Sequence, residues 1–159
     1  MTTTTVTHDA IDLLKADHRE AEDLFEQYEK LKDAGKTQEK LAVAKQVCGA
    51  LLIHMEIEEK MFYPRVREAT QDDELVNEAV VEHAGAKDLI KQLGTLTPED
   101  PMFDAKIKVL SEEIEHHVEE EEKEMFPKTR KTDIDLEALG HDLFEAKNKL
   151  RAEHGLPPA

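Results

Sequence analysis

Apolar residues recur at spacings of three and four through four long stretches of the chain, which is the repeat of one face of an α-helix. The stretches cover about residues 7–33, 38–64, 70–94 and 97–126, and short polar or glycine-containing connections separate them. Four helices of this length with short connections predict an all-α, up-down-up-down four-helix bundle. We expect Pro127 to end the fourth helix, because proline cannot continue the hydrogen-bond ladder.

A fifth stretch, residues 135–153, carries leucines on one side and predicts an additional C-terminal helix. We expect it to pack across the outside of the bundle or against a partner. The 159 residues suit a single domain, with the bundle over about residues 9–127. The composition agrees, since six glycines and six prolines are too few for a loop-rich β protein.

The charge balance and the single cysteine exclude several classes of protein. The chain carries 37 acidic and 21 basic residues, a net charge of −16, which argues against nucleic acid or an anionic membrane as the main partner. Cys48 is alone, so an internal disulfide framework is excluded. The N-terminus has no signal-peptide pattern, and no apolar run approaches the ~20 residues that span a bilayer. We therefore expect a cytoplasmic protein.

Polar groups interrupt the predicted inner faces in a regular way. Each of the four faces contains one histidine, and two of them also contain a glutamate one helical turn later. Burying such groups without partners is costly, but a metal ion would satisfy all of them together. Imidazole and carboxylate ligands suit iron, manganese or zinc. The six candidate metal ligands are His18, His54, Glu58, His83, His117 and Glu121.

An internal repeat links these residues into two equivalent halves. Residues 54–64 align with residues 117–127, and six of the eleven positions are identical. The preceding histidines are also similarly placed, 36 residues from His18 to His54 and 34 from His83 to His117. The chain therefore reads as two helical hairpins that each supply two histidines and a glutamate. A pseudo-two-fold relation between the hairpins predicts two metal ions side by side.

With these motifs, residues from about Ile11 to Pro127 resemble the hemerythrin family in its bacterial HHE cation-binding form. The resemblance implies a non-haem di-iron site inside the bundle, with an oxo or hydroxo group between the irons. It implies that His18 and His54 hold one iron, that His83 and His117 hold the other, and that two glutamates bridge them. Those are Glu58 and Glu121. Oxygen-carrying members have a further histidine near the third-helix ligand, whereas this set of four histidines resembles bacterial di-iron proteins linked to oxidative and nitrosative stress.

The leading hypothesis is a di-iron protein that binds O2 or reacts with peroxide or nitric oxide, and it leaves open whether the chain is an enzyme. One alternative is a protein that senses or stores iron or O2. Another is a helical interaction module that a metal stabilises. We assign no catalytic side chain, because the iron would carry the chemistry, and the sequence identifies no protein partner.

Several neighbours of the six ligands have weaker assignments. Glu59 and Glu122 follow the two proposed bridges, and we expect them to support the ligands or to face solvent. Glu22 lies on the inner side of the first helix and is a candidate hydrogen-bond acceptor for the site. His116 points about 100° away from its neighbour and is expected outside the site. Tyr63 could protect the site or hydrogen-bond to it, but we expect it to pack in the core or at its rim.

Overall fold

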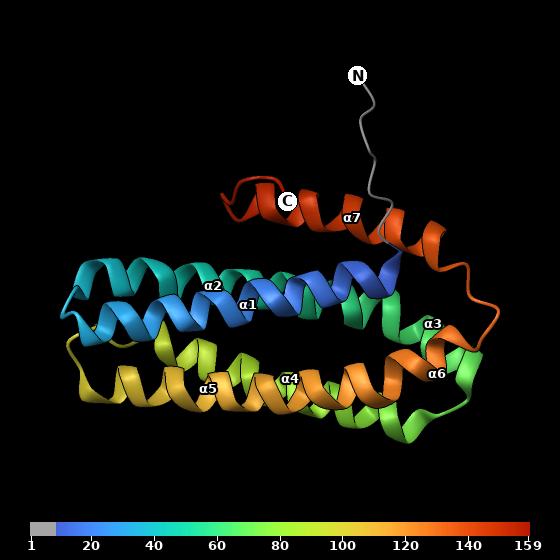
Figure 1. Ribbon diagram of the computed structural model, residues 1–159, viewed down its shortest axis with the longest axis horizontal. Coiled ribbons are helices and arrows are strands. Elements are labelled where there is room, and N and C mark those ends of the chain that lie inside the picture. Colours follow the sequence, from blue (N-terminus) through green and yellow to red (C-terminus); the bar gives the residue numbers. More distant parts are fainter. Residues whose placement is uncertain (1–8) are drawn as a thin grey trace.

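The computed structural model describes residues 9–159, which form helices and their connections without any strand (Figure 1). The prediction that the N-terminus carries no signal-peptide pattern concerns residues 1–8, which lie outside this range. Two π-helical turns, η1 (Glu58–Phe62) and η2 (Glu121–Met125), directly follow the second and the fourth long helices of the bundle. The α-helices are α1 (Ala10–Asp33), α2 (Thr37–Ile57), α3 (Tyr63–Thr70), α4 (Asp73–Leu93), α5 (Pro101–Glu120), α6 (Phe126–Arg130) and α7 (Leu136–Glu153).

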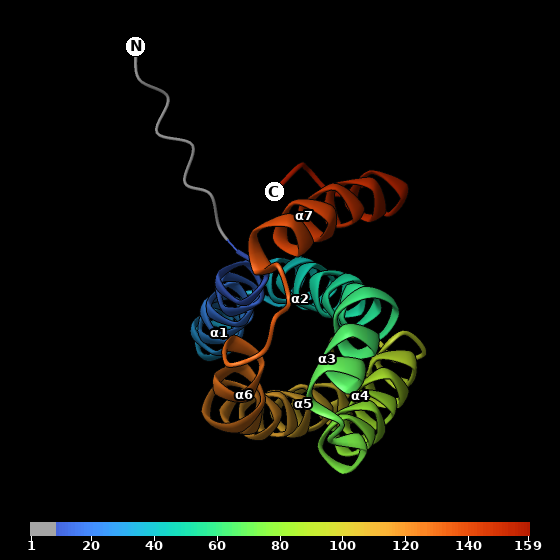
Figure 2. The ribbon, with the colours of Figure 1, turned by 90° about the vertical axis from the view of Figure 1, so that its right-hand side faces the viewer.

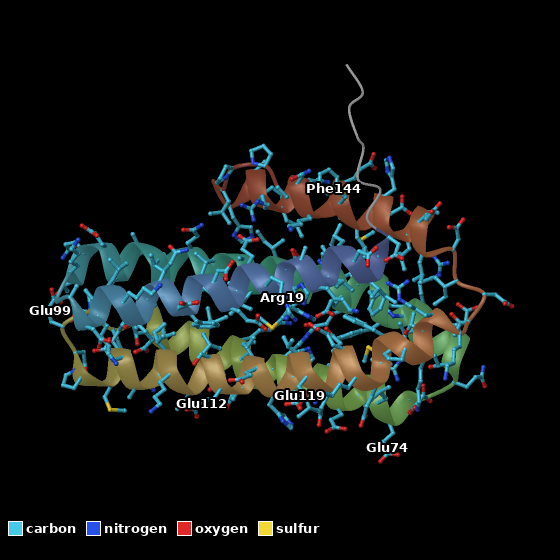
Figure 3. The ribbon with its side chains drawn as sticks, viewed as in Figure 1. Arg19, Glu74, Glu99, Glu112, Glu119 and Phe144 are labelled. Atoms are coloured by element: carbon cyan, nitrogen blue, oxygen red, sulfur yellow. The ribbon has the colours of Figure 1, made fainter. Side chains whose placement is uncertain are left out.

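The long helices α1, α2, α4 and α5 surround one interior, as the view along the bundle shows (Figure 2), and side chains fill the space between them (Figure 3). Successive helices run in opposite directions, which confirms the predicted up-down-up-down bundle (Figure 1). Helix α7 lies outside the bundle and packs against α1 and α2, on the side away from α4 and α5 (Figure 2). The additional C-terminal helix is therefore confirmed. None of the helices formed by residues 9–159 is long and apolar enough to cross a membrane.

Aspartate side chains fix the start of four helices by accepting a hydrogen bond from a free backbone N–H of the first turn. These N-caps are Asp9, Asp72, Asp100 and Asp135. The fourth bundle helix therefore begins at Pro101, later than the start predicted near residue 97. Pro101 suits that position because the first helical N–H has no partner within the helix.

The two π-helical turns occupy equivalent places in the internal repeat. Each begins at a predicted metal ligand, and its last hydrogen bond spans five residues, from the N–H of Tyr63 to the carbonyl of Glu58 and from the N–H of Phe126 to that of Glu121. A proline lies two residues after the end of each turn, Pro64 and Pro127, and the wider turn accommodates a residue that cannot donate an N–H. The prediction that Pro127 ends the fourth helix is therefore wrong, since helical structure continues through it to residue 130.

Apolar side chains form two buried clusters at the two ends of the bundle. On α1, Leu14 belongs to one cluster and Ala21 belongs to the other, and His18 lies midway between them. The polar ligands thus form a layer between two dry regions, which exclude water from both sides.

Candidate metal centre

The six predicted ligands come together in one buried layer in the middle of the bundle. Each long bundle helix contributes one histidine, and each π-helical turn begins with one glutamate. All six are buried, and Glu58 has no exposed surface. They are His18 on α1, His54 on α2, Glu58 in η1, His83 on α4, His117 on α5 and Glu121 in η2.

The ligand atoms form two groups that share both glutamates, and within each group they lie within 4.8 Å of one another. Glu58 reaches a histidine of each group, since its Oε1 lies 2.9 Å from Nε2 of His54 and 3.2 Å from Nε2 of His83. The shared carboxylates are what two neighbouring metal ions would need. The groups are His18, His54, Glu58 and Glu121, and Glu58, His83, His117 and Glu121.

Glu121 repeats this arrangement from the opposite corner of the bundle. Its Oε1 lies 3.1 Å from Nε2 of His18, and its Oε2 lies 3.3 Å from Nε2 of His117. The pseudo-two-fold relation inferred from the repeat is therefore present in the arrangement of the side chains.

Every histidine of the layer donates a hydrogen bond from Nδ1, the ring nitrogen that faces away from the centre, to a carboxylate. This contact fixes the ring orientation and leaves Nε2 as the atom that faces the centre, the arrangement that supports metal-bound histidines in proteins. The pairs are His18 with Glu122 at 2.7 Å, His54 with Asp17 at 2.8 Å, His83 with Glu59 at 2.9 Å and His117 with Glu82 at 2.8 Å.

Sequence reasoning found half of these supporting carboxylates. Glu59 and Glu122 were expected to support ligands, and both do so. Asp17 and Glu82 were missed, although each directly precedes a ligand histidine in the two halves of the repeat. Glu22 is exposed and pairs with Arg19, so the prediction that it is an acceptor at the site is wrong.

Tyr63 lies in the centre itself and does more than pack in the core. Its hydroxyl donates to Oε2 of Glu121 at 2.6 Å and lies 3.3 Å from Oε1 of Glu58. It also lies 3.2 Å from Nε2 of His83. The equivalent residue of the repeat is Phe126, whose ring stacks on that of His18. The two halves therefore differ by one hydroxyl group inside the centre.

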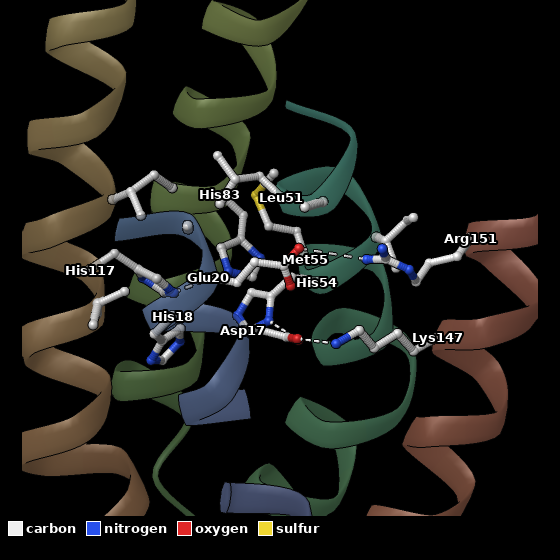
Figure 4. Close-up of a pocket in the computed structure, with 15 residues that line it drawn as sticks. Asp17, His18, Glu20, Leu51, His54, Met55, His83, His117, Lys147 and Arg151 are labelled. Atoms are coloured by element: carbon white, nitrogen blue, oxygen red, sulfur yellow. Dashed lines mark hydrogen bonds and ion pairs between the residues drawn. The ribbon is translucent and has the colours of Figure 1, made fainter. Parts of the chain in front are cut away.

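Helix α7 is connected to the layer through one ion pair. Lys147 pairs with Asp17, and the other oxygen of this carboxylate accepts the bond from His54 (Figure 4). All three side chains are buried. The position of the outer helix is therefore coupled to the orientation of one candidate ligand.

The electrostatic balance of the layer favours the protonated form of two imidazoles, His54 and His117. Burial lowers the pKa of His117, but the charge of Glu121 and the bond to Glu82 outweigh it and raise that pKa to about 10. Burial also lowers the pKa of His54, but Glu58 and Asp17 outweigh this effect and raise that pKa well above its usual range. Burial and the two glutamates raise the pKa of Tyr63, so its hydroxyl keeps its proton.

Buried polar atoms without partners show that this donor set fits a metal ion. Within residues 9–159, four buried side-chain atoms make no well-aligned hydrogen bond, although both nitrogens among them lie within 3.1 Å of a carboxylate oxygen, and all four belong to the predicted ligands. Such atoms are costly to bury, and nitrogen and oxygen donors that converge on one point satisfy a cation such as iron. The atoms are Nε2 of His18, Nε2 of His54, Oε2 of Glu58 and Oε1 of Glu121.

A small cavity opens beside the four histidines on the α1–α2 side (Figure 4). It has room for about one water-sized molecule. Apolar side chains such as Leu51 and Val118 form much of its wall, and Lys147 and Arg151 reach it from α7. A small uncharged molecule can therefore approach the layer there.

Four antiparallel helices around a buried layer of histidine and glutamate donors define a four-helix-bundle protein suited to metal binding. The chain belongs to the hemerythrin HHE cation binding domain family, whose pattern matches residues 9–129. That match includes all six candidate ligands.

Two relatives extend the comparison. A DNA nickase from Nostoc sp. strain PCC 7120 is 27% identical over 146 residues, which covers 91% of this chain and 40% of the nickase. The chain therefore spans less than half of that relative's length. A crystal structure of a hemerythrin HHE cation binding domain-containing protein from Mycobacterium kansasii matches with a TM-score of 0.78 at 23% identity. The match covers 92% of this chain and 89% of the other, and it shows the same fold.

Proposed function

We propose that the chain holds two iron ions in this layer and uses them to bind O2 or to react with peroxide or nitric oxide. The observation that carries the proposal is the sharing of Glu58 and Glu121 between two pairs of histidines. Two carboxylates common to two nitrogen pairs suit two adjacent cations. When bound, the iron pair supplies the redox chemistry and the open coordination positions that a small ligand needs.

The side chains of the layer would orient the metal and keep it dry. The four carboxylates at Nδ1 hold the imidazole rings so that Nε2 faces inward. Tyr63 holds a proton on Oη within hydrogen-bond distance of both glutamates, where it can donate to a ligand in the centre. Phe62 and Phe126 pack edge to face beneath the layer and exclude water from that end.

The cavity on the α1–α2 side supports a small substrate. Its size matches a diatomic molecule or peroxide, and its largely apolar wall favours an uncharged ligand. We do not extend DNA cleavage from the Nostoc relative to this chain. The chain spans 40% of that protein, and a net charge of −16 opposes the binding of a polyanion.

One contact supports iron or O2 sensing as a second candidate. Lys147 links α7 to His54 through Asp17, so a change of ligands at the centre would be transmitted to α7. Hydrogen exchange of the α7 amides, with and without iron, tests this candidate. Equal protection of α7 in both states would exclude it.

The experiment for the main proposal is anaerobic reconstitution with Fe2+ followed by metal analysis. We expect two iron ions per chain and, after oxidation, the absorption bands of a ferric pair. Stoichiometric O2 uptake would indicate a carrier, whereas catalytic turnover of peroxide or nitric oxide would indicate an enzyme. One tightly bound ion, or none, would refute the proposal.

A further inference from the structure

A second group of potential metal ligands lies on the surface between α4 and α5. Glu82 of α4 and His116 and Glu120 of α5 place one donor atom each within 4.8 Å of one another. Nε2 of His116 lies 3.2 Å from Glu120 and 3.7 Å from Glu82. His116 is 65% exposed, so this surface triad is open to solvent. One imidazole and two carboxylates suit a divalent cation such as Fe2+ or Zn2+.

A small, narrow cavity lies between two residues of the surface triad and the buried layer. Glu82 and Glu120 line it together with two of the buried ligands, His117 and Glu121. It holds no more than about one water molecule. Glu121 is buried; its Oε2 accepts from Tyr63, while its Oε1, 3.1 Å from Nε2 of His18, makes no well-aligned hydrogen bond in the described part of the chain. The cavity is therefore bordered by two carboxylates of the surface triad and by a buried carboxylate with one unsatisfied oxygen.

Glu82 contacts both ends of this route. Its Oε1 accepts the bond from Nδ1 of His117, while its Oε2 faces His116 on the surface. The carboxylates of Glu82 and Glu120 both lie beside His116, and a divalent cation would offset the repulsion between their charges.

The opposite side of the bundle is less suited to cations. The two carboxylates that line the cavity beneath α7, Asp17 and Glu20, are already paired with Lys147 and Arg151 of α7, and much of the remaining wall is apolar. The α4–α5 side and the α7 side therefore differ in the carboxylates that they offer to a cation, although the cavities on both sides border the same buried layer.

We propose that Glu82, His116 and Glu120 bind a divalent metal ion at the surface and deliver it along the cavity to Glu121. Because the cavity is narrow, the ion moves by exchanging carboxylate ligands and not by free diffusion. Binding at the surface triad stands by itself, whereas delivery rests on the proposed iron centre. The metal ion thus enters between α4 and α5, whereas the small ligand enters through the apolar cavity beneath α7.

Zinc titration of the iron-loaded protein tests the surface triad. We expect wild type to bind one Zn2+ ion more than His116→Ala by calorimetry. The matched control is His141→Ala on α7, which removes an exposed histidine that also has a glutamate four residues later, Glu145. This control should bind as many Zn2+ ions as wild type. Equal numbers for wild type and His116→Ala would overturn the surface site.

Anaerobic Fe2+ loading of the metal-free chain tests delivery. We expect His116→Ala and Glu120→Gln to reach the same final iron content as wild type but about tenfold more slowly, the lower end of the effect that charged clefts have on association rates. His141→Ala should load at the wild-type rate. Equal rates in wild type and both variants would overturn delivery. A wild-type chain that retains no buried iron would refute the proposed function and delivery together, while the same zinc titration carried out on the metal-free chain and on His116→Ala would still decide the surface triad.

Discussion

Replacing Glu58 by glutamine is the sharpest test of the two-iron arrangement. The side chain has no exposed surface, and its Oε1 lies 2.9 Å and 3.2 Å from ring nitrogens of both histidine groups. Glutamine keeps the size and removes the charge. Without metal, the amide is a poorer partner for the protonated His54, and we expect the apo bundle to lose about 1–3 kcal/mol of unfolding free energy.

The effect on iron binding is larger and has a definite signature. At a free iron concentration one hundred times Kd, each bound ion adds about 2.7 kcal/mol to the unfolding free energy of wild type. If the variant binds about one hundredfold more weakly, the same iron concentration adds only about 0.4 kcal/mol per ion. For a domain of this size these gains correspond to rises in Tm of roughly 5–11 °C and roughly 1–2 °C per ion.

The assay is thermal melting by circular dichroism of wild type and Glu58→Gln, each with and without iron under anaerobic conditions. Glu56→Gln is the matched control, because Glu56 lies on the same helix and pairs with exposed Lys60 outside the centre. Its iron-induced rise in Tm should equal that of wild type. If iron raises the Tm of wild type and Glu58→Gln equally, Glu58 is not a ligand and the assignment of the shared carboxylates is wrong.

Three further predictions follow from the same geometry. His117→Ala should lose at least one iron per chain by metal analysis, whereas His116→Ala should retain both, because only the former side chain faces the buried layer. Tyr63→Phe should destabilise the apo bundle by about 1–2 kcal/mol in urea unfolding, since it removes the bond to buried Glu121, and it should shift the absorption bands of the ferric protein. Because the pKa of His117 is raised to about 10 in the fold, its protonation adds to the unfolding free energy of the apo protein. This contribution is fully present below the unfolded pKa near 6.5 and is lost as pH rises through 10. Apo Tm should therefore fall over that range, and iron binding at pH 7.5 in dilute buffer should release at least about one proton per chain, less in His117→Ala.

Much of the fold and the site is determined locally and could be predicted from the sequence. Apolar spacing sets the helices, and the same spacing places His18 and His83 on inner faces, because the period of an α-helix is fixed by its backbone. A residue four positions after a histidine lies on the same face, which links His54 to Glu58. The internal repeat then indicates that two such hairpins face each other.

Other features depend on contacts between helices, and only the tertiary structure decided them. Glu22 and Glu122 both had a sequence-based case as supporting residues, but only Glu122 reaches His18, from a π-helical turn 104 residues away. Pro127 is a local stop signal, yet helical structure continues through it because the preceding wide turn removes the clash.

The pairing of Asp17 with His54 and Lys147, and the place of the Tyr63 hydroxyl, belong to the same class of feature. Each joins residues far apart in the chain, and it depends on how each helix is rotated about its own axis and how α7 rests on α1 and α2. The helical period fixes which residues share a face, but the rotation is set by the packing of all the helices together, which local sequence patterns do not contain.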